Sequence, residues 1–147
     1  MAKLKEPREL FSLKLSKAYA AQRETLEILE EVQKEVHDEE LKRLWEHHAG
    51  ETQRQIKNLD QAFQALGEKP QETKARVVEG VRGDHDEFMR QGAEPFLVDA
   101  FLAGAAAHIE HHEISAYEGL ITMAQAMGED DIVGLLQENL EQEQHTL

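Results

Sequence analysis

The sequence contains no cysteine, only three prolines and a single tryptophan among its 147 residues. Without cysteine, disulfides, thiolate metal sites, iron–sulfur clusters and cysteine nucleophiles are all excluded. Any bound metal must therefore be held by oxygen and imidazole nitrogen. Strand-like alternation of apolar and polar residues is also missing, whereas Glu, Gln, Leu, Ala and Lys are abundant. The composition predicts an all-α fold.

Positive charge is scarce as well. Sixteen basic residues stand against thirty acidic ones, which gives a formal net charge of −14. Such a chain repels nucleic acid and anionic membranes and attracts cations. No apolar run approaches the about 18 residues that a membrane-spanning helix needs, and the N-terminus lacks the apolar core of a secretory signal. We expect a cytoplasmic protein with no nucleic-acid partner and no membrane contact.

Apolar residues recur at helical spacing in several long segments. The pattern predicts helices over residues 7–36, from a cap at 37–40 to a stop at Gly67, within 71–90, over 96–127, and from a cap at 129–131 onward. The inner faces are expected to include Leu44 in the second helix, Val77 in the third and Leu147 in the last. Short connections between long helices favour antiparallel packing. We predict one domain over residues 1–147, an antiparallel four-helix bundle with a short extra helix between its two hairpins.

The segment His108-Ile109-Glu110-His111-His112-Glu113-Ile114-Ser115-Ala116-Tyr117 places two carboxylates and three imidazoles inside an apolar helical run. Glu110 and Glu113 are three residues apart and share a helix face, and Glu113 lies on the inward stripe. Carboxylates are costly to bury unless something pairs with them. The segment therefore indicates a metal ion.

Each long helix carries polar residues in the middle of its apolar stripe. These are Gln22, then His48 and Glu51, then Glu110 and Glu113, and finally Glu143. In a bundle such residues meet at one depth, and di-metal carboxylate proteins build their sites in this way. Four glutamates would balance two divalent cations, and hard oxygen donors favour iron or manganese. His48 and His111 are candidate ligands or groups that orient ligands.

A structural interpretation accounts for part of the same pattern. In a chain rich in Glu and Gln, some of these residues fall beside any stripe by chance, and one of Glu110 and Glu113 could face solvent. Five histidines on two helices cannot all point inward, so most are expected at the surface. No phosphate-binding loop, nucleophile elbow or basic aromatic stripe supports a different chemistry.

Several blocks of the sequence resemble the YciE/YciF family of bacterial stress-associated, ferritin-like proteins. They are Gly50-Glu51-Thr52 through Gln61, Glu79-Gly80-Val81, the segment from Asp99 through Tyr117, and Leu135 through Glu143. The resemblance implies a ferritin-like fold, usually a homodimer, with a di-metal site and a role in stress response. It also implies Glu51, Glu110, Glu113 and Glu143 as site residues, with Asp84 where relatives often have glutamate.

Two positions depart from the family's pattern. Gln22 falls where relatives often carry glutamate, and Arg54 replaces the histidine that follows a ligand glutamate by three residues in better-known ferritin-like enzymes. Two hypotheses follow. The first is a protein that binds two iron or manganese ions and reacts with oxygen or peroxide. The second is a metal-free structural or interaction bundle that has lost the site.

Overall fold

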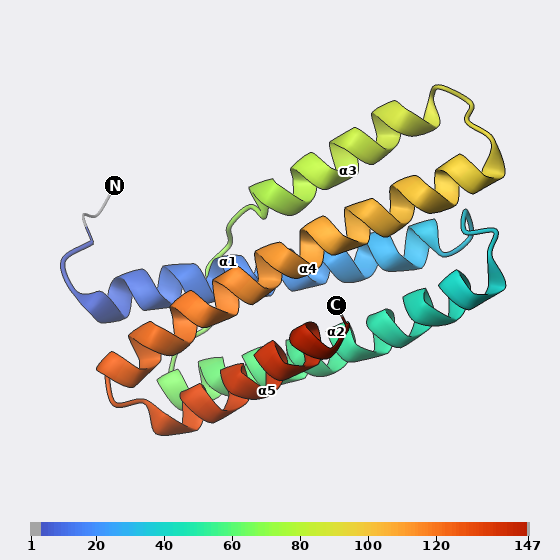
Figure 1. Ribbon diagram of the computed structural model, residues 1–147. Coiled ribbons are helices and arrows are strands. Elements are labelled where there is room, and N and C mark those ends of the chain that lie inside the picture. The colour runs from blue at the N-terminus through green and yellow to red at the C-terminus, as the bar shows by residue number, and fades with distance from the viewer. Residues whose placement is uncertain (1–3, 147) are drawn as a thin grey trace.

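A computed structural model describes residues 4–146, which form five α-helices and no strand (Figure 1). The helices are α1 (Pro7–Val32), α2 (Glu39–Leu66), α3 (Arg76–Met89), α4 (Pro95–Ala126) and α5 (Asp130–Thr146). The pairs α1–α2 and α4–α5 are hairpins, and α2 packs on α5 while α1 packs on α4. The shorter α3 lies outside this bundle, against α1 and α4. This is the predicted antiparallel four-helix bundle with an added short helix.

Local sequence signals set most helix ends. Pro7 occupies the first turn of α1, where Glu6 and Glu9 form a reciprocal capping box. The Asp38 side chain accepts a hydrogen bond from the Leu41 amide at the start of α2. Gly67 ends α2 with a φ of 74°, a left-handed conformation that glycine adopts without steric cost.

The apolar core consists of two clusters at opposite ends of the bundle. One is built from the first half of α1, the second halves of α2 and α4, and α5, and includes Phe11, Leu59, Leu120 and Leu136. The other joins the remaining halves of α1, α2 and α4 to α3, around Leu29, Trp45, Val78 and Leu102. Buried polar side chains occupy the level between them. The bundle therefore has a polar layer inside its core.

Three details of the sequence prediction were wrong. The first helix ends at Val32, four residues early, and Val36 is buried beyond a turn. Val77 is 52% exposed because α3 packs through one face only, which buries Val78 instead. Leu44 is 59% exposed.

The exposure of Leu44 follows from the short length of α5. This helix ends at Thr146, whose hydroxyl donates to Glu51 Oε2 over 3.2 Å, so no part of α5 described here reaches the first turns of α2. Leu147, also predicted to be inward, lies outside the described residues. Among residues 4–146, no helix is long and apolar enough to cross a membrane.

Candidate metal centre

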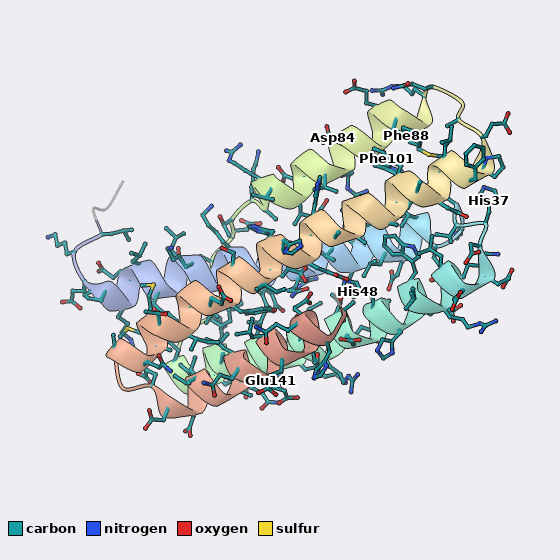
Figure 2. The ribbon with its side chains drawn as sticks, viewed as in Figure 1. His37, His48, Asp84, Phe88, Phe101 and Glu141 are labelled. Carbon is teal, nitrogen blue, oxygen red and sulfur yellow. The ribbon has the colours of Figure 1, made fainter. Side chains whose placement is uncertain are left out.

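The polar layer draws side chains from all four bundle helices, among them the buried His48, which Figure 2 labels. The buried polar residues at this level are Gln22 and Thr25 of α1, His48, Glu51, Thr52 and Gln55 of α2, Glu110 and Glu113 of α4, and Asn139 and Glu143 of α5. Each lies on the inward stripe of its helix. The helical period alone therefore turns these groups toward one another.

Two carboxyl groups of α4 are the most strongly perturbed acids of the layer. Burial, together with the charges of Glu143 and Glu51, raises the pKa of Glu110 to about 7. Burial also raises the pKa of Glu113 well above its ordinary value, and the neighbouring Glu143 adds to the effect. Like charges in a low-dielectric site disfavour ionisation of one another. These side chains thus form an interacting set of acids, in which the protonated forms of Glu110 and Glu113 are favoured.

The other two glutamates have polar partners. Glu51 pairs through Oε1 with Nε2 of the exposed His47 at 2.5 Å. Glu143 Oε1 accepts a hydrogen bond from Gln55 Nε2 at 2.8 Å. Burial lowers the pKa of His48, which favours the neutral imidazole, although Glu143 and Glu51 oppose this shift. Its Nδ1 lies 3.4 Å from Glu110 Oε1, too far for a strong hydrogen bond.

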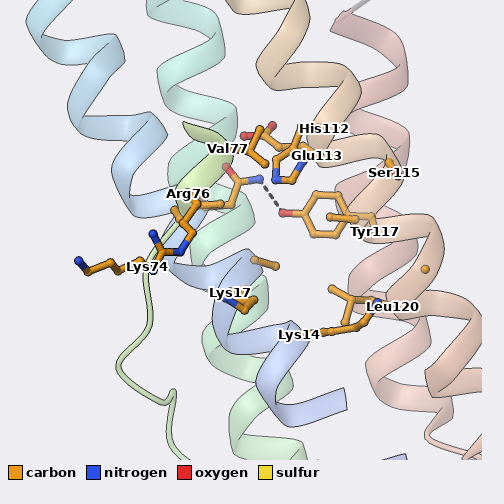
Figure 3. Close-up of a pocket in the computed structure, with 16 residues that line it drawn as sticks. Lys14, Lys17, Lys74, Arg76, Val77, His112, Glu113, Ser115, Tyr117 and Leu120 are labelled. Atoms are coloured by element: carbon orange, nitrogen blue, oxygen red, sulfur yellow. Dashed lines mark hydrogen bonds between the residues drawn. The ribbon is translucent and has the colours of Figure 1, made fainter. Parts of the chain in front are cut away.

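Amide and phenol groups form a connected network at one side of the carboxylates. Gln22 Nε2 donates to Gln55 Oε1 at 2.7 Å and contacts the Tyr117 hydroxyl at 2.6 Å, the bond drawn in Figure 3. Tyr117 in turn donates to Gln55 Oε1 at 3.1 Å, and Asn139 Nδ2 donates to the backbone carbonyl of Gln55 at 3.2 Å. The network fixes the Gln22 carboxamide beside the carboxylates.

Several buried polar atoms of the layer have no hydrogen-bond partner within the described part of the chain. They are Gln22 Oε1, Thr25 Oγ1, His48 Nδ1, both carboxylate oxygens of Glu113, and Glu143 Oε2. Unpartnered buried polar atoms are rare in folded proteins and ask for an explanation. Carboxylate, amide oxygen and neutral imidazole are all ligands of iron and manganese. The donor set therefore fits such an ion chemically.

The structure brings together six of the eight predicted site residues: Gln22, His48, Glu51, Glu110, Glu113 and Glu143. His111 and Asp84 are exposed. His111 follows Glu110 by one residue, about 100° around the helix, and so leaves the inward face. Asp84 lies on α3, outside the four-helix bundle (Figure 2). Across residues 4–146, no three His, Asp or Glu side chains are already arranged to hold one ion.

Sequence reasoning missed the role of Gln55 and Asn139. Both lie at helical spacing from other inward residues, but the helical period gives only the face of a residue and not its partner on another helix. Thr25, beside Glu113, was also missed, and its hydroxyl lowers the pKa of that carboxyl against the larger effects of burial and Glu143. A buried amide one helical turn from a candidate ligand is the signal that could have identified Gln55.

Comparisons with known proteins assign the chain to a family. Residues 6–147 match the family model described as a domain of unknown function, DUF892. The chain is 29% identical over 144 residues to protein YciF of Escherichia coli K12, covering 97% of this chain and 87% of the relative. The crystal structure of that E. coli stress protein superposes with a TM-score of 0.91 over 97% of this chain and 91% of YciF.

Two further solved structures are similar. YcfI of Rhodopseudomonas palustris, for which a structural role has been suggested, is 30% identical with a TM-score of 0.93 and covers 98% of this chain and 92% of its own. A Xanthomonas campestris protein is 24% identical with a TM-score of 0.74, over 95% of this chain and 86% of its own, which supports the fold. The chain therefore belongs to the DUF892 family, the YciE/YciF family that its sequence resembles.

Proposed function

We propose that this protein binds two iron or manganese ions in the polar layer of its bundle. The carboxylates of Glu51, Glu110, Glu113 and Glu143 would hold the ions, and Gln22 Oε1 and His48 Nδ1 would be weaker ligands. The observation that carries this proposal is the set of buried oxygen and nitrogen atoms that have no hydrogen-bond partner in the described chain. Two divalent cations would neutralise the four carboxylates and give these atoms partners.

Each helix has a distinct task in this proposal. α4 supplies two carboxylates from one face, while the adjacent helices α2 and α5 supply one each. The Tyr117 and Gln55 side chains hold the Gln22 carboxamide through its Nε2, which leaves Gln22 Oε1 free for a ligand role. Bound iron or manganese would supply reactivity toward oxygen or peroxide. The relative YciF is called a stress protein, and we extend a stress-response role to this chain.

A metal-free structural or interaction bundle is the rival function. It is favoured by the neutral Gln22, by the absence of an assembled three-ligand group among residues 4–146, and by the structural role suggested for YcfI. In this case bound protons would neutralise the carboxylates of the layer. The raised pKa values of Glu110 and Glu113 favour this protonated form. Under this alternative, replacing the buried acids with neutral side chains would stabilise the protein.

Elemental analysis distinguishes the two functions. The protein is purified without chelator or affinity tag beside a Glu110→Gln/Glu113→Gln variant and a control, Glu118→Gln/Glu138→Gln, that changes two exposed glutamates. We expect about two iron or manganese ions per chain, retained in the control and lost in the buried variant. Absence of stoichiometric metal after anaerobic loading would overturn the proposal and favour the rival.

A further inference from the structure

A cavity of about 380 Å³ opens between α1, α4 and the segment that leads into α3 (Figure 3). Its walls are largely apolar and include Ala18, Ala21, Ala116 and Leu120. The exposed side chain of Val77 borders it. A concave, mostly apolar space of this size is typical of a site for a small organic molecule.

The mouth of this cavity is positively charged, in a protein whose net charge is −14. Lys14, Lys17, Lys74 and Arg76 all line it and are exposed. We refer to these four residues as the cationic mouth, and Figure 3 labels each of them. Lys17 Nζ donates to the neutral Thr73 hydroxyl at 3.3 Å. Elsewhere in the protein Arg8 and Arg82 pair with glutamates, but no residue of the cationic mouth pairs with a carboxylate within residues 4–146.

The start of α3 adds to the positive potential at the same place. This helix of 14 residues begins at Arg76, and its N-cap is Ala75, whose side chain makes no capping hydrogen bond. The first backbone N–H groups of a helix need partners, and its dipole places partial positive charge there. Ala75 and Arg76 both line the cavity. An anion at the mouth would therefore meet both side-chain cations and unsatisfied amides.

The inner end of the cavity reaches the polar layer. Gln22 and Glu113 line it, and they are 1% and 3% exposed. Gln22 Oε1 and both oxygens of Glu113 have no hydrogen-bond partner in the described chain. The cavity thus joins a cationic entrance, apolar walls and the candidate metal centre.

We propose that this cavity binds a small organic anion that carries an apolar chain. Its carboxylate or phosphate group lies on the cationic mouth at the start of α3, and its apolar body lies against Ala18, Ala116 and Leu120. The uncharged end of the anion would face the proposed metal centre. A role of the anion as a substrate rests on that proposed function, whereas its binding does not. Binding itself uses no metal, so it can be tested with the metal-free protein.

The test is titration calorimetry with chelator-treated protein and straight-chain carboxylates. Hexanoate, octanoate and decanoate are the probes, with octanol as the uncharged control and inorganic phosphate as the control without a chain. Each buried methylene is worth about 0.8 kcal/mol, so affinity should rise about fourfold per carbon. Octanol and inorganic phosphate should both bind more weakly than octanoate. Alkyl phosphates then decide whether the mouth prefers phosphate to carboxylate.

Two variants locate the site. Lys14→Gln/Lys74→Gln/Arg76→Gln should weaken octanoate binding by about tenfold or more, because three favourable charge contacts are lost. The control Lys34→Gln/Arg54→Gln/Lys57→Gln makes the same change of charge at exposed positions outside the cavity and should retain binding. Ala116→Phe fills the cavity and should abolish binding while thermal melting shows a folded protein.

Three results would overturn the inference. The first is that octanoate does not bind, or that carboxylate affinity does not depend on chain length. The second is that the control triple variant loses as much octanoate affinity as the mouth variant. The third is that folded Ala116→Phe binds octanoate as well as the wild type does. A change in self-association caused by the mouth variant, without carboxylate binding, would assign this face to a second copy of the chain. Elemental analysis tests the metal centre separately, so failure of one proposal leaves the other standing.

Discussion

Neutralising Glu110 should remove a measurable part of the dependence of stability on pH. The folded protein holds the proton of Glu110 with a pKa of about 7, against an ordinary value of 4.5. Between these values the folded state binds more protons than the unfolded state, so stability falls as pH rises. The stability that the protonated Glu110 provides is fully present below about pH 4.5 and is lost as pH rises through about 7.

The expected magnitude follows from the same two values. A pKa shift of one unit corresponds to about 1.4 kcal/mol, so the shift of Glu110 from 4.5 to about 7 corresponds to ~3 kcal/mol. Glu110 is 6% exposed, and solvent at the edge of the layer screens part of this energy. We expect the unfolding free energy of the metal-free protein to lose about 2 kcal/mol more between pH 5 and pH 8 than that of Glu110→Gln.

Urea unfolding followed by circular dichroism, in the presence of chelator, measures this difference at each pH. Glu118→Gln on the same helix is the control, because Glu118 is exposed. His85, whose partners are Glu35 and Asp86, is unaffected by the substitution and cancels in the comparison. The Glu110 charge also raises the pKa of Glu113, so the measured difference includes the effect of Glu110 on that neighbour. Parallel pH curves for the wild type and Glu110→Gln would refute the reasoning, since they would show that Glu110 ionises as freely when folded as when unfolded.

Two further predictions concern hydrogen bonds that fix the site and the hairpins. Tyr117→Phe removes the hydroxyl that meets the Gln22 carboxamide in the core, so we expect a loss of about 1–3 kcal/mol in urea unfolding, and an unchanged midpoint would contradict the network. Asp99→Ala removes the carboxylate that accepts the backbone N–H groups of His37 and Asp38 at 2.8 and 2.9 Å. We expect it to cost about 1–2 kcal/mol and to speed proteolysis at the α1–α2 turn, with Asp99→Asn intermediate.

The sequence predicted the fold well because its signals are local and consistent. Pro7, Asp38 and Gly67 mark helix ends through backbone chemistry that needs no tertiary context. The errors arise where a neighbouring helix is missing. Leu44 and Val77 both have the helical spacing of a buried residue. Leu44 is exposed because α5 is too short to cover it, and Val77 is exposed because α3 packs through only one face.

The candidate site was only partly predictable for a related reason. The helical period places Glu110 and Glu113 inward and turns the adjacent His111 outward. It cannot assign the bond between Gln22 and Gln55, which depends on the pairing of α1 with α2. Asp84 was proposed from resemblance alone, and the position of α3 outside the bundle is a tertiary property that no local signal carries.

The polar layer itself is an argument for function. A bundle of this size gains stability from apolar contacts, and each cluster above and below the layer provides them. Placing Glu110, Glu113 and Glu143 between the clusters forfeits apolar burial and adds repulsion, and the pKa of the first two is raised by burial first and by this repulsion second. A purely structural bundle would be more stable with leucine there. Under the proposed function a cation would offset this repulsion, and the unpartnered oxygens of Glu113 that would hold it belong to a residue that also lines the cavity.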